Sequence, residues 1–325
     1  MDRVQKVLQV IAGFSEEEKH CVLESLSGPK ASTVPVSPAE VLTVPQDKVR
    51  CPDCDSFATN RFGRFRGLQR YKCISCSRTF NSQSATPMAR VRSPEKFRRF
   101  AAQMAQGGVS LRKSAKDLNI DLKTALRWRH RIIQGYAVAK ERKLRGIAEA
   151  DETFFLFSEK GDKTVSKRRK PRKRGGKAKT AGISDNQVPV IVGCDRQGEL
   201  VLGATDPGRI SMENIEEILG DRIDEKATLC TDSHSSFRAF AKANHLKYRP
   251  VNVSKGQRVV KKVFHIQHVN SAHSRLKGWM GRFRGVSTKH LDSYAQWFGL
   301  LEETKNLPKR EENFIARSVA HRLRK

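Results

Sequence analysis

Two aspartates lie at positions that suit metal-dependent phosphoryl chemistry. Asp151 falls in a segment rich in strand-forming residues, and Asp232 directly follows the short apolar run at residues 227–231. These patterns predict that both carboxylates are carried by strands, with Asp232 at a strand end. Such a pair can bind Mg²⁺, because that ion prefers oxygen ligands and keeps several waters. Two such ions would activate a water or a 3′-hydroxyl and stabilise the leaving oxygen in an in-line displacement at phosphorus.

A third segment, residues 263–283, combines an apolar stripe with polar residues beside it. At about 100° per residue, one helical face collects the apolar side chains of Val269, Ala272, Leu276, Trp279, Met280 and Phe283. Asn270 and Lys277 lie two turns apart on the neighbouring face, and His273 lies at the border. The segment is either a helix that completes an active site or an amphipathic core helix with a solvated basic edge. On its own it favours the core helix.

In the active-site interpretation, each polar residue has an expected role. Asp151 and Asp232 are the anionic Mg²⁺ ligands, and Lys277 contacts a phosphate near the cut. Asn270 could ligate through its amide oxygen, although it adds no negative charge. His273 could assist as a proton acceptor or phosphate contact, or it could be a packed histidine.

Four neighbouring residues are weaker candidates. Alternation along a strand points Glu152 to the face opposite Asp151, so we expect a surface or structural acid there. His265 and His268 lie close to Asn270, and His234 directly follows the Asp232 segment and could support that aspartate.

Two close pairs of cysteines have the spacing of a zinc site. Cys51 and Cys54 are separated by two residues, as are Cys73 and Cys76, and the pairs flank a basic, aromatic segment. This arrangement predicts a zinc ribbon in which four thiolates bind one structural Zn²⁺ and leave no open position for chemistry. The alternative is a chance grouping of free cysteines. The remaining cysteines stand alone, which is typical of a reducing cytoplasm.

Residues 93–134 predict three helices, the last two joined by a tight turn. Ser93, Ser110 and Asp121 each precede a helical pattern and suit the N-cap position. The arrangement resembles a helix-turn-helix whose second helix would contact DNA through Lys123, Arg127, Arg129 and Arg131. A small helical linker domain with a solvated basic face is the alternative.

The overall charge favours a polyanionic partner. The 325 residues include 63 Lys and Arg against 34 Asp and Glu, for a formal net charge of +29. Such an excess favours nucleic acid, although a basic ribosomal component would share it. The absence of an apolar run of 18 or more residues and of a signal-peptide pattern predicts a cytoplasmic protein without a membrane span.

Composition divides the chain into six expected parts. These are an N-terminal helical segment (1–28), a linker (29–48), a zinc ribbon (49–82), a helix-turn-helix domain (92–140), an α/β catalytic domain (145–305) and a basic C-terminal tail (306–325). Within the catalytic domain, residues 160–179 hold eleven Lys or Arg. They predict a disordered loop that either touches phosphates or is simply solvated.

The element order of the catalytic domain matches a ribonuclease H-like fold. A strand carries Asp151, a hairpin and a helix follow, the next strand ends at Asp232, and a later helix carries Asn270. In that fold the first two acids lie on adjacent central strands.

These motifs resemble those of DDE-type insertion-sequence transposases. The resemblance rests on Asp151-Glu152-Thr153, on Thr231-Asp232 and on Asn270 followed seven residues later by Lys277. Together with the zinc ribbon, the segment after residue 272 is similar to insertion-sequence family fifteen-ninety-five, in the branch with Asn as the third residue.

The resemblance implies a prokaryotic, nucleoid-associated enzyme. It would bind terminal inverted repeats, cut at the transposon ends, and join the 3′-hydroxyl to target DNA with Mg²⁺ or Mn²⁺. Two element ends make a homodimer or higher assembly the expected state. The alternatives are a domesticated DNA-binding regulator with an inactive catalytic fold and a ribonuclease H-like nuclease of another role, such as junction resolution.

Overall fold

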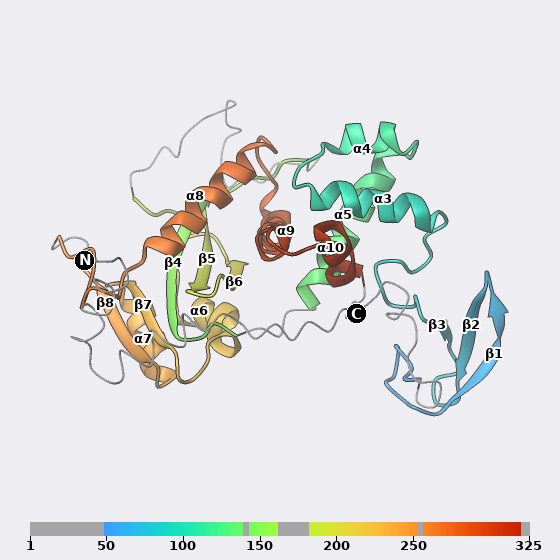
Figure 1. Ribbon diagram of the computed structural model, residues 1–325, viewed down its shortest axis with the longest axis horizontal. Helices are drawn as coiled ribbons and strands as arrows, with labels where there is room; N and C mark the ends of the chain where they lie inside the picture. The colour runs from blue at the N-terminus through green and yellow to red at the C-terminus, as the bar shows by residue number, and fades with distance from the viewer. Residues whose placement is uncertain (1–48, 139–142, 162–181, 253–255, 320–325) are drawn as a thin grey trace, which may run out of the picture. The chain divides into compact units, whose positions relative to one another are not determined.

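The computed structural model describes residues 49–138, 143–161, 182–252 and 256–319 (Figure 1). The chain divides into two compact units, one of residues 1–32 and 141–295 and the other of residues 33–140 and 296–325. The expected helical segment at 1–28, the linker at 29–48 and nearly all of the basic run at 160–179 lie outside the described residues. In the described part of the chain, no helix is long and apolar enough to cross a membrane.

A five-stranded mixed sheet organises the first unit. In spatial order its strands are β6 (Leu200–Ala204), β5 (Gln187–Asp195), β4 (Ile147–Leu156), β7 (Thr228–Asp232) and β8 (Lys247–Val251). The first three strands are mutually antiparallel, and β7 runs parallel to both β4 and β8. The predicted hairpin is confirmed as β5 and β6. Its long apolar strand β5 suits a buried central position.

Helices cover one face of this sheet through alternating residues of β4. Ala148 and Ala150 belong to an apolar core with residues of α6 (Met212–Leu219) and α7 (Ser235–Ala243). These small side chains let the helices approach closely. At Gly203 on β6 a Cβ atom would lie only 2.6 Å from Cγ1 of Ile218, so the position requires glycine.

The opposite face of β4 carries the odd-numbered residues and meets α8 (Gln267–Gly281) (Figure 1). The helix contributes Val269, Ala272, Leu276, Trp279 and Met280 to the core, which confirms these members of the predicted apolar stripe. Phe283, the last predicted member, is half-buried and lies beyond the end of the helix. The helix begins four residues later than the expected start at residue 263. The reason is that Phe264 pairs with Val260 in an isolated bridge that is incompatible with helix.

Three helices of the second unit match the predicted pattern. They are α3 (Pro94–Ala105), α4 (Leu111–Asp117) and α5 (Leu122–Val138). Ser110 caps α4 by accepting the backbone N–H of Lys113, and Asp121 accepts the N–H of Lys123 at the start of α5. Capping chemistry thus fixes the starts of α4 and α5 locally. Ser93 stands at the N-cap of α3 as predicted, but its side chain makes no capping hydrogen bond.

The C-terminal region differs from the expected basic tail over 306–325. Its described part contains α10 (Arg310–Val319), which packs on α3 and α5 and fully buries Phe314. At Gly135 of α5, a Cβ atom would collide with the backbone oxygen of Ser318. The tail prediction was wrong for these residues because the basic side chains hide an amphipathic helix whose partners lie far away in sequence. The helix before it, α9 (Leu291–Thr304), spans the division between the units.

The cysteine pairs accompany a small three-stranded antiparallel sheet of β1 (Thr59–Phe65), β2 (Leu68–Cys73) and β3 (Thr79–Asn81). Its buried core consists of Cys51, Cys73 and Phe80. An apolar core of this size is too small to stabilise a sheet without a further constraint.

We expect Phe314→Ala to lower the free energy of unfolding of the second unit by about 3–5 kcal/mol, because it leaves a cavity beneath α10. Denaturant unfolding followed by circular dichroism measures the change. The control Glu312→Ala, at an exposed position on the same helix, should stay within about 0.5 kcal/mol of the parent. Equal effects of the two substitutions would contradict the packing of α10.

Candidate active site

Strand pairing brings Asp151 and Asp232 to neighbouring positions. In the parallel ladder between β4 and β7, Ala150 is the partner of Thr231. The next position along each strand is therefore Asp151 on β4 and Asp232 on β7, and laterally paired residues point to the same face of a sheet. This face is the one that meets α8.

The environment of Asp151 disfavours its ionised form. The side chain is 18% exposed, and its pKa is raised to about 8 by burial first, then by the charges of Glu152 and Asp232. Lys277 acts in the opposite direction. A cation bound here would reverse this balance, because it favours the carboxylate form of its ligands. The donor set thus fits a hard divalent ion.

His273 lies beside Asp151, with its Nδ1 3.8 Å from Oδ2 of the aspartate. Burial, and secondly the charge of Lys277, lower the pKa of His273 to about 4, so the ring is neutral at neutral pH. Its Nε2 is buried and has no hydrogen-bond partner within the described residues. The structure therefore combines both sequence interpretations, because His273 is packed in the core and also adjoins Asp151.

Asn270 and Lys277 extend from α8 as the sequence predicted. Both side chains are exposed. The charge of Lys277 influences Asp151 and His273, whereas the structure gives Asn270 no side-chain hydrogen bond to these residues. Asp151, Asp232, His273 and Lys277 thus form one electrostatic cluster, and Asn270 lies at its edge on the same helix.

Two further residues support the end of β7. The backbone N–H of His234 donates to Oδ1 of Asp232 over 3.1 Å, and the His234 ring caps α7 by accepting the N–H of Ser236. Glu152 is half-buried, and its pKa is raised by burial and then by Asp232. Of the two expected roles, surface or structural acid, this environment favours the structural one, because Oε2 of Glu152 is buried without a hydrogen-bond partner in the described part of the chain.

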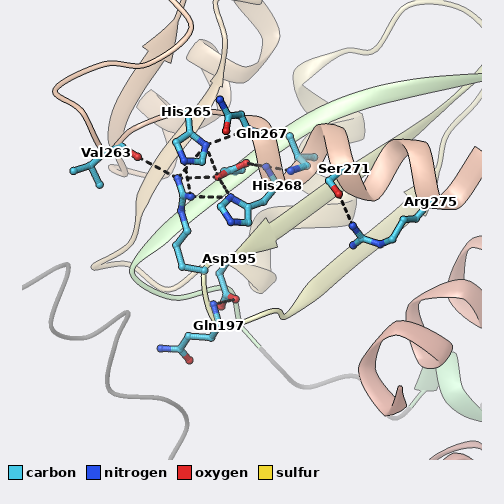
Figure 2. A network of polar contacts seen from close by, with 11 residues as sticks. Asp195, Gln197, Val263, His265, Gln267, His268, Ser271 and Arg275 are labelled. Carbon is cyan, nitrogen blue, oxygen red and sulfur yellow. Dashed lines mark hydrogen bonds and ion pairs between the residues drawn. The ribbon is translucent and has the colours of Figure 1, made fainter. Parts of the chain in front are cut away.

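The sequence reasoning did not single out Glu149. This carboxylate is 0% exposed and is contacted by Arg196, His265 and His268 (Figure 2). A signal was present, since a Glu two residues before Asp151 must share its face of the strand. Its partners lie far away in sequence, which is why no local pattern revealed them.

The four predicted zinc ligands converge. The Sγ atoms of Cys51 and Cys76 lie 3.6 Å apart, and those of Cys54 and Cys73 lie 3.5 Å apart. All four lie within 4.8 Å of one another. A tetrahedral ion bound at about 2.3 Å needs sulfur atoms roughly 3.8 Å apart, so the cluster fits zinc.

The four basic residues predicted to contact DNA on α5 separate into two groups. Lys123 and Arg127 are exposed. Arg129 is only 3% exposed, donates to the carbonyl oxygen of Val109 over 3.0 Å and lies over the ring of Trp297. The prediction that Arg129 contacts DNA is therefore wrong, because its guanidinium is buried inside the second unit. Arg131 is half-buried and donates to the carbonyl oxygen of Ala89.

Comparison with known proteins identifies the class of this domain. Residues 143–299 match the family described as the ISXO2-like transposase domain. This region contains β4 to β8 and α8, and with them the whole aspartate cluster. The family match and the curated relative support the resemblance to insertion-sequence family fifteen-ninety-five that the sequence motifs indicated.

One curated relative comes from a transposable element. An uncharacterised protein in transposable element ISH50 of Halobacterium salinarum is 28% identical over 270 residues, which cover 81% of this chain and 88% of the relative. Among solved structures, the pre-cleavage Mos1 transpososome is 11% identical and covers 70% of this chain and 81% of its own, with a TM-score of 0.22. The mariner Mos1 paired end complex with Mg is 12% identical and covers 70% of this chain and 81% of its own, with a TM-score of 0.24.

We expect Asp151→Asn to stabilise the domain in Mg²⁺-free buffer without chelator. The carboxyl has a pKa of about 8 when folded and about 4 when unfolded, so its contribution to stability is lost as the pH rises through that window. The asparagine side chain cannot ionise, so the variant does not lose this stability as the pH rises. The gain should be small at pH 4 and on the order of a few kcal/mol at pH 8.

Thermal unfolding at both pH values measures this gain. Asp206→Asn, at an exposed carboxylate of the same unit, is the control and should show no such pH-dependent gain. A gain for Asp151→Asn that is equal at pH 4 and pH 8 would contradict the burial of an uncompensated charge.

Proposed function

We propose that the chain binds the terminal inverted repeats of an insertion sequence and catalyses metal-dependent DNA cleavage and strand transfer. The observation that carries this proposal is the adjacency of Asp151 and Asp232 within an ISXO2-like transposase domain. Lys277 and Asn270 complete the proposed catalytic set from α8. The sheet order, with the first acid on central β4 and the second on neighbouring β7, supports a ribonuclease H-like fold.

Asp151 and Asp232 would hold Mg²⁺ or Mn²⁺, with the amide oxygen of Asn270 as a neutral third ligand. When bound, such ions lower the pKa of a coordinated water or hydroxyl and stabilise charge on the leaving oxygen. The raised pKa of Asp151 supports this assignment, since its carboxylate has no strong compensating charge from the protein.

The side chains around the metal ligands have separate tasks. Lys277 places a positive charge next to Asp151, where it would hold a DNA phosphate in line with the attacking oxygen. His273 is neutral and buried, so it adjoins the Asp151 carboxylate without neutralising it. The N–H of His234 fixes Oδ1 of Asp232 and leaves the other carboxylate oxygen available.

DNA would be bound mainly outside the transposase domain. Exposed Lys123 and Arg127 on α5 remain available for phosphate contacts. On the small sheet, Phe62 is exposed and lies beneath the cationic groups of Arg70 and Lys72. Basic and aromatic side chains on one face suit nucleic acid, because they combine charge with stacking. Paired element ends would be held by a dimer or a higher assembly.

We expect Asp232→Ala to abolish cutting while leaving end binding intact. The substrate is a linear duplex that carries the inverted repeats flanking the reading frame, incubated with Mg²⁺ or Mn²⁺. The cleavage rate should fall by at least about 10²-fold, the scale for losing one group that stabilises transition-state charge. Asp206→Asn serves as the control. Full cleavage by Asp232→Ala would refute the site.

The second candidate function is a DNA-binding regulator with an inactive catalytic fold. It is favoured by Asn270, which supplies no negative charge at the third position. The same assay decides between the two functions. If the chain is a regulator, the unmodified protein binds the ends but does not cut them with either Mg²⁺ or Mn²⁺.

The cysteine cluster would bind one structural Zn²⁺ per chain. We expect Cys76→Ser to lose the zinc and to unfold β1–β3, because the cluster replaces a hydrophobic core there. Elemental analysis measures the metal, and hydrogen exchange compares the amides of β2 with those of β4, which should stay protected. Ser75→Ala changes only an exposed hydrogen bond to Ser56 and should retain one zinc. Full zinc content in Cys76→Ser would contradict the four-cysteine site.

A further inference from the structure

The first turn of α8 is attached to β4 by one buried carboxylate. Oε2 of Glu149 accepts the backbone N–H groups of His268 over 2.8 Å and Val269 over 3.1 Å. These amides belong to the helix N-terminus, where N–H groups have no partner within the helix and a negative charge is stabilising. Glu149 therefore acts as an N-terminal cap supplied by a strand far away in sequence.

The other oxygen of Glu149 is bound by Arg196. Nη2 of Arg196 lies 2.9 Å from Oε1, and the same nitrogen donates to the carbonyl oxygen of Val263 over 3.2 Å. Arg196 comes from the turn between β5 and β6. Oδ1 of Asp195 holds that turn by accepting the N–H groups of Gln197 and Glu199. The contact thus joins β4, the hairpin turn and the segment that leads into α8.

Two histidines complete the enclosure of the guanidinium (Figure 2). Nη1 of Arg196 lies 2.8 Å from Nε2 of His265 and 2.7 Å from Nδ1 of His268. A guanidinium only donates hydrogen bonds, so Nη1 can bond only to a ring nitrogen that carries no proton. Nδ1 of His268 also lies 2.9 Å from Oε1 of Glu149. Burial and the Arg196 charge both lower the pKa of His265, which keeps that ring neutral.

Glu149, His265 and His268 also have a spacing that could hold a metal ion, with ligand atoms within 4.8 Å of one another. The guanidinium of Arg196 lies within hydrogen-bond distance of all three. It is charged at every accessible pH. Arg196 therefore already provides the cation of this cluster, and a metal ion would have to displace it.

We propose that Glu149 and Arg196 form a latch that sets the register of α8 on β4, and that both are positioning residues of the transposase site. This inference rests on the proposed function only for its catalytic consequence. From Glu149 to Asp151 the strand advances by about 7 Å. From His268 to His273 the helix advances by about 7.5 Å. A helix held at Glu149 therefore brings His273 to Asp151, with Lys277 one turn further on.

The latch must contain both charges to work. Glu149 is wholly buried and Arg196 nearly so, so removing either one leaves an uncompensated charge in the interior. The contact of His273 with Asp151, at 3.8 Å, is too long to hold the helix by itself. A change at the latch should therefore move Lys277 and Asn270 relative to the two aspartates.

The test uses Glu149→Gln in the full chain, with hydrogen exchange at the amides of His268 and Val269 as the first readout. We expect exchange there to become at least about 10-fold faster, because the charge-assisted cap is lost. End cleavage should slow by about 10²-fold, the cost of misplacing a catalytic group by roughly 1 Å. The Kd for the DNA ends should not change. Ser271→Ala, which loses only an exposed hydrogen bond to Arg275, should alter none of these quantities.

The double variant Glu149→Met/Arg196→Met separates positioning from stability. Replacing a buried ion pair with apolar side chains restores thermal stability, but it provides no acceptor for the α8 amides. We expect its melting temperature to recover while cleavage stays slow. Recovery of both would overturn the latch as a positioning device, and so would unchanged exchange in Glu149→Gln. A second zinc per chain in the parent, lost in Glu149→Gln, would assign the cluster to a metal instead. If the parent cuts no DNA, the proposed function fails, and exchange still decides whether the latch holds α8.

Discussion

Pairing of β4 with β7 forces two carboxylates, Asp151 and Asp232, into neighbouring positions on one face of the sheet. The ladder offers no alternative register, because a slip by one residue would turn the apolar side of β4 away from α6 and α7. Burial first, and then the charges of Glu152 and Asp232, raise the pKa of Asp151 to about 8. The protein therefore accepts an unfavourable interaction at this point, which is typical of a site that is completed by a ligand of opposite charge.

Strand β4 carries two buried acids on the same face with opposite surroundings. Glu149 is neutralised by Arg196 and by two helix N–H groups. Asp151, two residues further on, has a neutral histidine 3.8 Å away, and the charge of Lys277 only partly offsets the burial of its carboxylate. The first carboxylate is thus used for structure and the second is left available for chemistry. Because both face α8, one helix serves as the partner of the structural acid and as the carrier of the other proposed catalytic residues.

Much of this arrangement was predictable from the sequence. The alternation around Asp151, the caps at Ser110 and Asp121 and the paired cysteines are local signals, and each appears in the structure where it was expected. The helix-turn-helix helices and the hairpin followed from the same kind of pattern. Local signals worked because capping, alternation and metal spacing are determined by residues only a few positions apart.

What the sequence did not reveal depends on partners that are distant in the chain. Arg129 looked like a surface cation because its neighbours on α5 are basic, but it lies over Trp297. The sequence placed Phe314 in a basic tail, whereas in the structure it is buried on a helix that packs on α3 and α5. Glu149 looked like one acid among several, and its role appears only when Arg196 and the start of α8 are placed around it.

If Asp151 and Asp232 bind a divalent cation together, metal-directed cleavage of the polypeptide will detect that ion. Fe²⁺ in place of Mg²⁺, with ascorbate and peroxide, generates hydroxyl radicals that cut the chain next to the bound ion. We expect fragments that end near residues 151 and 232, suppressed by excess Mg²⁺ and absent from Asp232→Asn. Cuts that occur only around the four cysteines or around Glu149, His265 and His268, and that persist in Asp232→Asn, would contradict such a site.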